Sequence, residues 1–147
     1  EGNYHDEAIS RASAQDISAA DMSMFDDVDA IIFVGGLSPK LEGEEMKVNY
    51  KGFRGGDRTS IELPETQRRY IAELKKTGKP VIFVHLSGSA VALAPEVQNC
   101  DAILQGWYAG QNGGQAVADV LFGDYNPAGR LPVTFYASDD DLPAYDE

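Results

Sequence analysis

The sequence predicts an α/β fold with a mostly parallel sheet. Three short apolar runs, at residues 30–34, 81–84 and 102–105, are rich in β-branched, aromatic and aliphatic side chains, which is typical of buried strands. Helical segments alternate with these runs, and this alternation is typical of parallel strands joined by helices. With 147 residues, the chain is long enough for one domain with a hydrophobic core.

The first strand lies between a short helix and a long connection. Residues 22–28 are expected to form the helix, with Asp21 as its N-terminal cap. The connection covers residues 35–63 and shows no clear hydrophobic period. A connection of this length in a compact domain is usually functional or disordered.

A longer helix precedes the second strand. Pro64 and Glu65 favour a helix start, because proline is tolerated in the first turn and an acidic side chain there complements the helix dipole. The helix is predicted to run to about Thr77, and Gly78 is a typical residue just after a helix end.

The remaining elements are shorter. Residues 91–97 form an apolar segment that is expected to be helical as far as Pro95. A helix is predicted over residues 115–122. A last strand is expected at residues 131–136, at the edge of the sheet because Pro132 cannot donate a backbone hydrogen bond.

Charge and composition exclude several classes of partner. Asp and Glu number 24 against 12 Lys and Arg, a formal charge of −12, which argues against binding to nucleic acid or to an anionic membrane. No apolar run approaches the roughly 20 residues that a membrane-spanning helix needs. The chain begins with Glu1 and shows no signal-peptide pattern, so we expect it to be a piece or a processed form of a longer protein.

No cofactor and no metal are expected. Cys100 is the only cysteine, which excludes an internal disulfide and a multi-cysteine zinc site, and we expect it to be a small buried thiol. His5 and His85 are far apart and lack the spacing of metal ligands. The complete glycine-rich patterns that cradle phosphates are absent as well.

A cluster of carboxylates follows the first strand. Glu42, Glu44 and Glu45 come shortly after the strand ends at Gly35-Gly36. Ligands of open α/β sheets bind at the carboxyl ends of the strands. Crowded carboxylates there are candidates for acid/base chemistry, because like charges push one pKa toward neutrality. The alternative is a solvated acidic loop in an acidic protein.

Other polar and aromatic side chains follow the second and third strands. Ser87 and Ser89 could be nucleophiles, but no His-acid pair lies near them in the sequence, so a role in a turn is favoured. Trp107 and Tyr108 could stack on a sugar ring or pack the loop after the third strand, and packing is slightly favoured.

Several segments together resemble a known family. The segments are residues 35–45, 55–59, 86–90, 105–111 and 121–135. In this order, between about residues 25 and 136, they are similar to the second domain of family 3 glycoside hydrolases, which are β-glucosidases and β-xylosidases. The last segment is the most specific single match.

The resemblance implies a three-layer α/β/α sandwich with a mostly parallel sheet, apparently truncated at the N-terminus. Residues 1–147 would then be a partial domain of this type, with loosely ordered flanks at residues 1–20 and 137–147. A TIM-like barrel that precedes this domain carries the aspartate nucleophile in the family. This chain is too short to hold both domains, so the nucleophile is expected elsewhere and the isolated chain is expected to be inactive.

The resemblance also implies a function. The family hydrolyses terminal β-linked sugars of plant-type oligosaccharides and retains the anomeric configuration through a covalent glycosyl-enzyme. Xylosides are the expected substrates, because the Glu-x-Glu segment resembles the xylosidase branch, and glucosides are the alternative. A periplasmic or secreted location follows by the same resemblance.

The general acid/base is assigned by the same resemblance. In many relatives it is a glutamate shortly before an Asp-Arg pair, and the Glu-x-Glu match favours Glu44, with Glu45 second and Glu42 third. The Asp57-Arg58 pair lies beyond an insertion, and the spacing of compact relatives falls on Arg54, which cannot be an acid. Asp57 and Arg58 are expected either to pair and hold the loop or to contact the sugar.

Two other classes of function stay open at this point. The domain could bind sugar or stabilise a partner without taking part in catalysis. A flavodoxin-like mononucleotide binder would have the same fold class, but the sequence lacks a phosphate loop.

Overall fold

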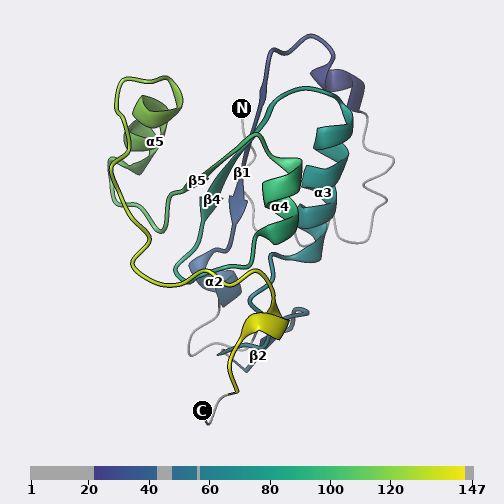
Figure 1. The fold of residues 1–147 in the computed structure, drawn as a ribbon, viewed down its shortest axis with the longest axis vertical. Helices are drawn as coiled ribbons and strands as arrows, with labels where there is room; N and C mark the ends of the chain where they lie inside the picture. The colour runs from purple at the N-terminus through teal and green to yellow at the C-terminus, as the bar shows by residue number, and fades with distance from the viewer. Residues whose placement is uncertain (1–21, 43–47, 56, 145–147) are drawn as a thin grey trace.

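A computed structural model of the chain confirms the α/β fold with a parallel sheet. The structure describes residues 22–42, 48–55 and 57–144. The strands of the main sheet are β1 (Ile31–Gly36), β4 (Val81–Leu86) and β5 (Ala102–Gln105). They are parallel and lie in the order β1-β4-β5, with Ile31 opposite Val81 and Ile82 opposite Ala102 (Figure 1). Their carboxyl ends therefore meet at one edge of the sheet.

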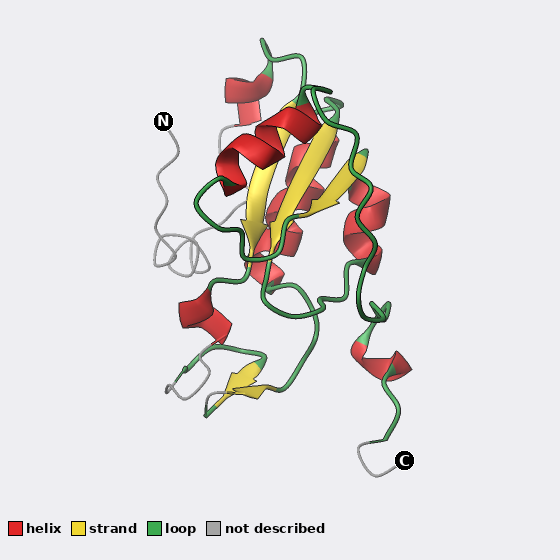
Figure 2. Cartoon of the chain, turned by 90° about the vertical axis from the view of Figure 1, so that its left-hand side faces the viewer, coloured by secondary structure: helices red, strands yellow, loops and turns green. Residues whose placement is uncertain are grey.

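Helices lie on both faces of the sheet. α3 (Glu65–Lys76) and α4 (Ala94–Asn99) lie together on one face, and α5 (Gly113–Leu121) lies on the opposite face (Figures 1 and 2). α3 buries Gln67, Ile71 and Leu74, a spacing that places all three on one side of the helix. The predicted helices at 65–77 and 115–122 are thus confirmed, with ends shifted by one or two residues.

The hydrophobic core lies between the sheet and α3. One buried cluster is formed by Leu37, Leu63, Ile71, Phe83 and Val91, and a second by Ile31, Leu74 and Val81. β4 is buried along most of its length, as expected. β1 differs, because Ile32 and Val34 are 47% and 43% exposed on the other face. β1 is one of the two edge strands of the described sheet, and with one face exposed, the expectation that this whole run is buried is wrong.

Three predictions of local structure need correction. The segment before β5 becomes helical at Ala94 rather than ending at Pro95, because a proline in the first turn of α4 costs no hydrogen bond. Residues 131–136 form no strand, and Leu131 and Val133 are exposed. Residues 22–28 form only a 3₁₀ helix, η3 (Met22–Phe25).

The long connection after β1 contains regular structure of its own. It includes the short helix α2 (Pro39–Glu42) and a small antiparallel hairpin of β2 (Phe53–Arg54) and β3 (Asp57–Arg58). Near the C-terminus, η4 (Asp139–Asp141) is a single 3₁₀ turn. A search of the described residues finds no helix with the length and hydropathy of a membrane-spanning segment.

Candidate functional site

The end of β1 is fixed by a buried glutamine. The side-chain amide of Gln67 on α3 donates to the carbonyl of Gly36 and accepts from its N–H, both at 2.7 Å. Gly36 has φ +122°, and a Cβ there would lie 1.9 Å from the carbonyl oxygen of Leu86. Only glycine fits this close approach, which turns the chain directly from β1 into α2.

α2 places Glu42 beside the loops that follow β4 and β5. Ser38 precedes the helix and accepts a hydrogen bond from the N–H of Leu41 at 3.1 Å. The Glu42 carboxylate accepts a hydrogen bond from the hydroxyl of Ser89 on one oxygen and from that of Tyr108 on the other, each at 2.5 Å. Three loops that are distant in sequence therefore meet at one carboxylate.

The residues around Glu42 leave little free space. A Cβ on Gly88 would lie 2.6 Å from the Tyr108 ring and 2.7 Å from a Glu42 oxygen. Trp107 has φ +53°, and its ring packs edge-on against Phe135 at a centroid distance of 5.8 Å. Burial and the neighbouring Glu42 raise the pKa of the Tyr108 phenol, so Tyr108 acts as a hydrogen-bond donor at neutral pH.

Arg58 joins this cluster from the hairpin. Its guanidinium donates to the Ser89 hydroxyl at 3.0 Å and to the backbone carbonyls of Ser60, Glu62 and Ala90 at 3.1–3.4 Å. Burial lowers the pKa of Arg58, and the charges of Glu42 and Asp139 act in the opposite direction. The described ion pairs do not include one between Arg58 and Asp57.

Ser87 and Ser89 lie in the turn after β4, and their hydrogen bonds show what they do there. The Ser87 hydroxyl donates to the carbonyl of Ser89 at 2.8 Å and accepts from the side-chain amide of Gln105 at 3.2 Å. Gln105 also contacts Nδ1 of the buried His85 at 2.5 Å, and burial lowers the pKa of His85. Neither serine is hydrogen-bonded directly to a histidine in the described residues, which agrees with the predicted role in a turn.

The predicted site residues are therefore only partly brought together. The structure places Glu42 and Arg58 in one cluster, bridged by Ser89. Asp57 is next to Arg58 on β3, paired with Arg54 of β2. Glu44 and Glu45 lie outside the described residues. No group of three His, Cys, Asp or Glu side chains in the described ranges could hold a metal ion.

The sequence did not indicate that Tyr108 and Gln105 contact other parts of this site. Both lie at the carboxyl end of β5, a strand whose position was predicted correctly. This position was the one feature of the sequence that could have indicated that they belong to the site. Their partners, Glu42 and Ser87, are 66 and 18 residues away, so spacing alone could not identify the contacts.

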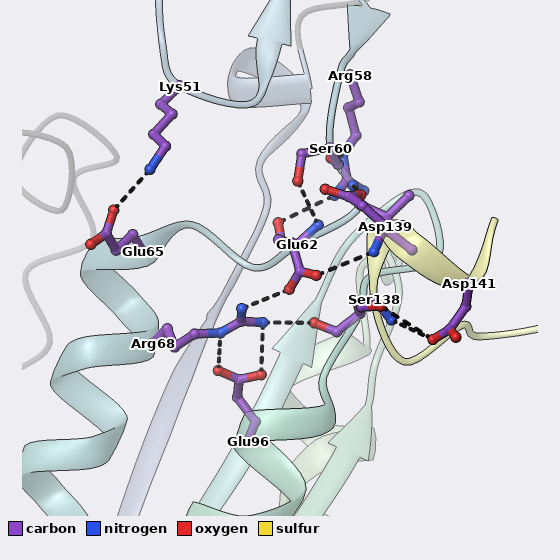
Figure 3. A network of polar contacts seen from close by, with 12 residues as sticks. Lys51, Arg58, Ser60, Glu62, Glu65, Arg68, Glu96, Ser138, Asp139 and Asp141 are labelled. Atoms are coloured by element: carbon purple, nitrogen blue, oxygen red, sulfur yellow. Dashed lines mark hydrogen bonds and ion pairs between the residues drawn. The ribbon is translucent and has the colours of Figure 1, made fainter.

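A second polar network lies on the α3 side of the molecule (Figure 3). Arg68 binds Glu96 through two hydrogen bonds, at 2.8 and 3.2 Å, and binds Glu62 at 2.6 Å. Burial lowers the pKa of Arg68, but the hydrogen bonds and charges of these two carboxylates outweigh it and the pKa is raised. Asp139 completes the network, since its N–H donates to Glu62 and its carboxylate accepts from the N–H of Ile61.

Cys100 lies near the same network. It is half-buried rather than buried, and it packs against both hydrophobic clusters. Burial, with the charges of Glu96 and Asp101, raises its pKa to about 11. A thiol with such a pKa is a poor nucleophile at neutral pH.

Comparison with known sequences gives a consistent result. Residues 3–147 match the family model of the glycosyl hydrolase family 3 C-terminal domain. The chain is 62% identical over 120 residues to a xylan 1,4-beta-xylosidase of Xylanibacter ruminicola, covering 82% of this chain and 14% of that protein. It is 52% identical over 88 residues to a periplasmic beta-glucosidase of Salmonella typhimurium, covering 60% of this chain and 12% of the relative.

Solved structures agree. A β-glucosidase from Erythrobacter marinus matches with a TM-score of 0.71 and 32% identity, over 95% of this chain and 17% of that one. A family 3 exo-β-xylosidase in complex with a xylobiose aziridine probe matches with a TM-score of 0.68 and 34% identity, over 83% of this chain and 15% of that one. The chain therefore spans only about one seventh of the length of these relatives.

Proposed function

Because this chain belongs to the C-terminal domain family of glycosyl hydrolase family 3, we propose that it is the second domain of a retaining, exo-acting β-glycosidase. The domain supplies the general acid/base, and a TIM-like barrel in the rest of the protein supplies the nucleophile. The substrates are terminal β-linked sugars of plant-type oligosaccharides. The 62% identity to a xylan 1,4-beta-xylosidase is the observation that carries the proposal, and it favours xylosides over glucosides.

Glu44 is the proposed general acid/base, with Glu45 as the alternative. One carboxyl group must be neutral before reaction so that it can protonate the leaving oxygen, and it then acts as a base toward water. Both oxygens of Glu42 already accept hydrogen bonds from hydroxyl groups of the protein, which suits a structural carboxylate better than a proton donor. Glu44 follows Glu42 by two residues in the sequence, in the connection after β1, and ligands of such sheets bind at the carboxyl ends of the strands.

Arg58 is proposed to position the loop, with Asp57 beside it. The guanidinium makes four N–H···O hydrogen bonds, to Ser60, Glu62, Ser89 and Ala90. A guanidinium has five N–H donors, so at most one is left for a sugar hydroxyl. These contacts favour holding the loop over direct recognition of the substrate.

The proposed location is periplasmic or secreted. The support is a relative named as a periplasmic beta-glucosidase, to which the chain is 52% identical over 88 residues. The isolated chain is proposed to be inactive, since the barrel nucleophile would be missing.

The test requires the longer protein that includes the barrel. Glu44→Ala is compared with the parent on aryl β-xylosides that have good and poor leaving groups, with and without azide. We expect poor leaving groups to lose far more activity and azide to restore turnover of a good one, because azide replaces water without needing a base. Glu65→Ala, at an exposed surface pair with Lys51, serves as the matched control and leaves the rates unchanged.

Other outcomes would change the assignment. Uniformly small effects of Glu44→Ala would move the role to Glu45. The same small effects of Glu45→Ala would favour a domain that binds sugar or stabilises the barrel without supplying the acid. Turnover of an aryl β-glycoside by the pure 147-residue chain would refute the division of the active site between two domains.

A further inference from the structure

Glu42 joins three loops that end the three parallel strands. It is the last residue of α2, which follows β1. Its two oxygens bind the hydroxyls of Ser89, which follows β4, and Tyr108, which follows β5. Each loop is thereby tied to the same carboxylate, and hydroxyl bonds to an ionised acceptor are among the stronger hydrogen bonds in proteins.

The loop after β5 has an unfavourable backbone conformation at this point. Trp107 has φ +53°, and in the described part of the chain it is the one non-glycine residue with positive φ. A bulky residue in this region is strained and persists only where surrounding contacts over-determine its conformation. The next residue, Tyr108, makes the hydrogen bond to Glu42, and the Trp107 ring contacts Phe135.

The neighbouring turn is shaped to accept this loop. A Cβ on Gly88 would come within 3.1 Å of two atoms of the Tyr108 ring and within 2.7 Å of a Glu42 oxygen. The ring therefore lies directly against the backbone of the turn after β4. Arg58 holds the other side of the same turn through Ser89 and Ala90.

We propose that Glu42 is a positioning residue that fixes Tyr108 and thereby holds Trp107 in its strained conformation. Resting on the proposed function, this keeps two aromatic side chains in one arrangement at the edge of the sheet where the glycoside binds. Removal of the carboxylate releases the Tyr108 hydroxyl, and Trp107 then relaxes to negative φ.

Trp107 provides a direct readout, because it is the only tryptophan in the chain. The experiment measures acrylamide quenching of tryptophan fluorescence and the near-UV circular dichroism of the folded 147-residue chain. The variants are Glu42→Ala, Glu42→Gln and Tyr108→Phe. We expect higher quenching and a weaker dichroism signal in Glu42→Ala and Tyr108→Phe. Glu42→Gln should lie between Glu42→Ala and the parent, because its amide oxygen can still accept one hydroxyl bond.

Controls separate positioning from a general loss of stability. Glu65→Gln removes an exposed carboxylate and should leave the Trp107 signals unchanged. A merely structural role of Glu42 would lower the urea midpoint and leave quenching in the folded state equal to that of the parent, and this result would overturn the proposal. If Glu42→Ala does not fold, Tyr108→Phe decides, since it keeps the ring and loses only the hydroxyl. No sugar is present, so the outcome is independent of the azide test on Glu44.

Discussion

The two polar networks of this domain differ in how their charged groups are paired. In the network between α3 and α4, Arg68 contacts the carboxylates of Glu62 and Glu96 directly, at 2.6 and 2.8 Å. At the carboxyl ends of the strands, the Ser89 hydroxyl lies between Arg58 and Glu42, accepting from one and donating to the other. Direct pairing compensates two charges that have lost their water, whereas in the strand-end network neutral hydroxyls and backbone carbonyls satisfy each charged group separately.

The largest expected effect is in the directly paired network. Glu96→Ala removes a fully buried carboxylate and leaves the half-buried Arg68 with one partner fewer. We expect a loss of about 3 kcal/mol in the free energy of unfolding, measured by urea denaturation. A loss below about 1 kcal/mol would mean that this pair is no more important than a surface pair, and the contrast between the networks would fail.

A second variant tests how tightly the strand-end network is packed. Gly88→Ala places a methyl group against the Tyr108 ring and a Glu42 oxygen. We expect a loss of about 1–3 kcal/mol of stability, because a well-packed region must move to accept it. Gly114→Ala, where no atom lies within 4 Å of the added carbon, is the matched control in a helix and is expected to be neutral or slightly stabilising.

The reactivity of the Cys100 thiol tests the environment near the directly paired network. Its pKa of about 11 predicts that iodoacetamide modifies the folded chain at pH 8 about 100-fold more slowly than an unperturbed thiol, because the reactive thiolate is scarce. A raised folded-state pKa stabilises the fold below about pH 9 and loses this contribution as pH rises toward about 11. Modification in native buffer as fast as in urea would contradict the prediction.

The smallest effect is expected at an exposed pair. Lys51 and Glu65 lie 3.3 Å apart, with side chains 88% and 65% exposed. Lys51→Ala should change the free energy of unfolding by no more than about 0.5 kcal/mol, because water and salt screen such pairs. A larger loss would show that exposure does not separate the weak pairs from the strong ones in this protein.

Sequence patterns predicted the sheet and the position of the site better than the contacts within it. The apolar runs located all three strands, but β1 and β4 each extend two residues beyond the run, and β1 includes Gly35 and Gly36, which were expected to end it. The exposed face of β1 was not predicted, because an apolar run does not tell whether both faces of its strand are covered. The strand expected at residues 131–136 is absent: these residues pair with neither described sheet, and β propensity alone forms no strand.

The candidate site illustrates the same limit. Glu42 and Arg58 were selected from a local motif, and both do lie at the carboxyl ends of the strands. Their bridging residue, Ser89, was considered only as a nucleophile or a turn residue. The contact between Glu42 and Tyr108 joins positions 66 residues apart and depends on a left-handed Trp107, for which no sequence pattern provides a signal.

The contact of Asp139 with residues 61 and 62 has a mechanical consequence. Its two hydrogen bonds join positions 78 and 77 residues apart, and the Glu62 carbonyl in the same segment accepts a hydrogen bond from Arg58. Tension applied beyond residue 141 would therefore load this segment before it reaches the sheet. Separating the parallel strands requires many backbone hydrogen bonds to break together. The two hydrogen bonds at the exposed turn therefore break first. The C-terminal turn would thus detach first, and its release would spare the contacts of Arg58 and the sheet from the load.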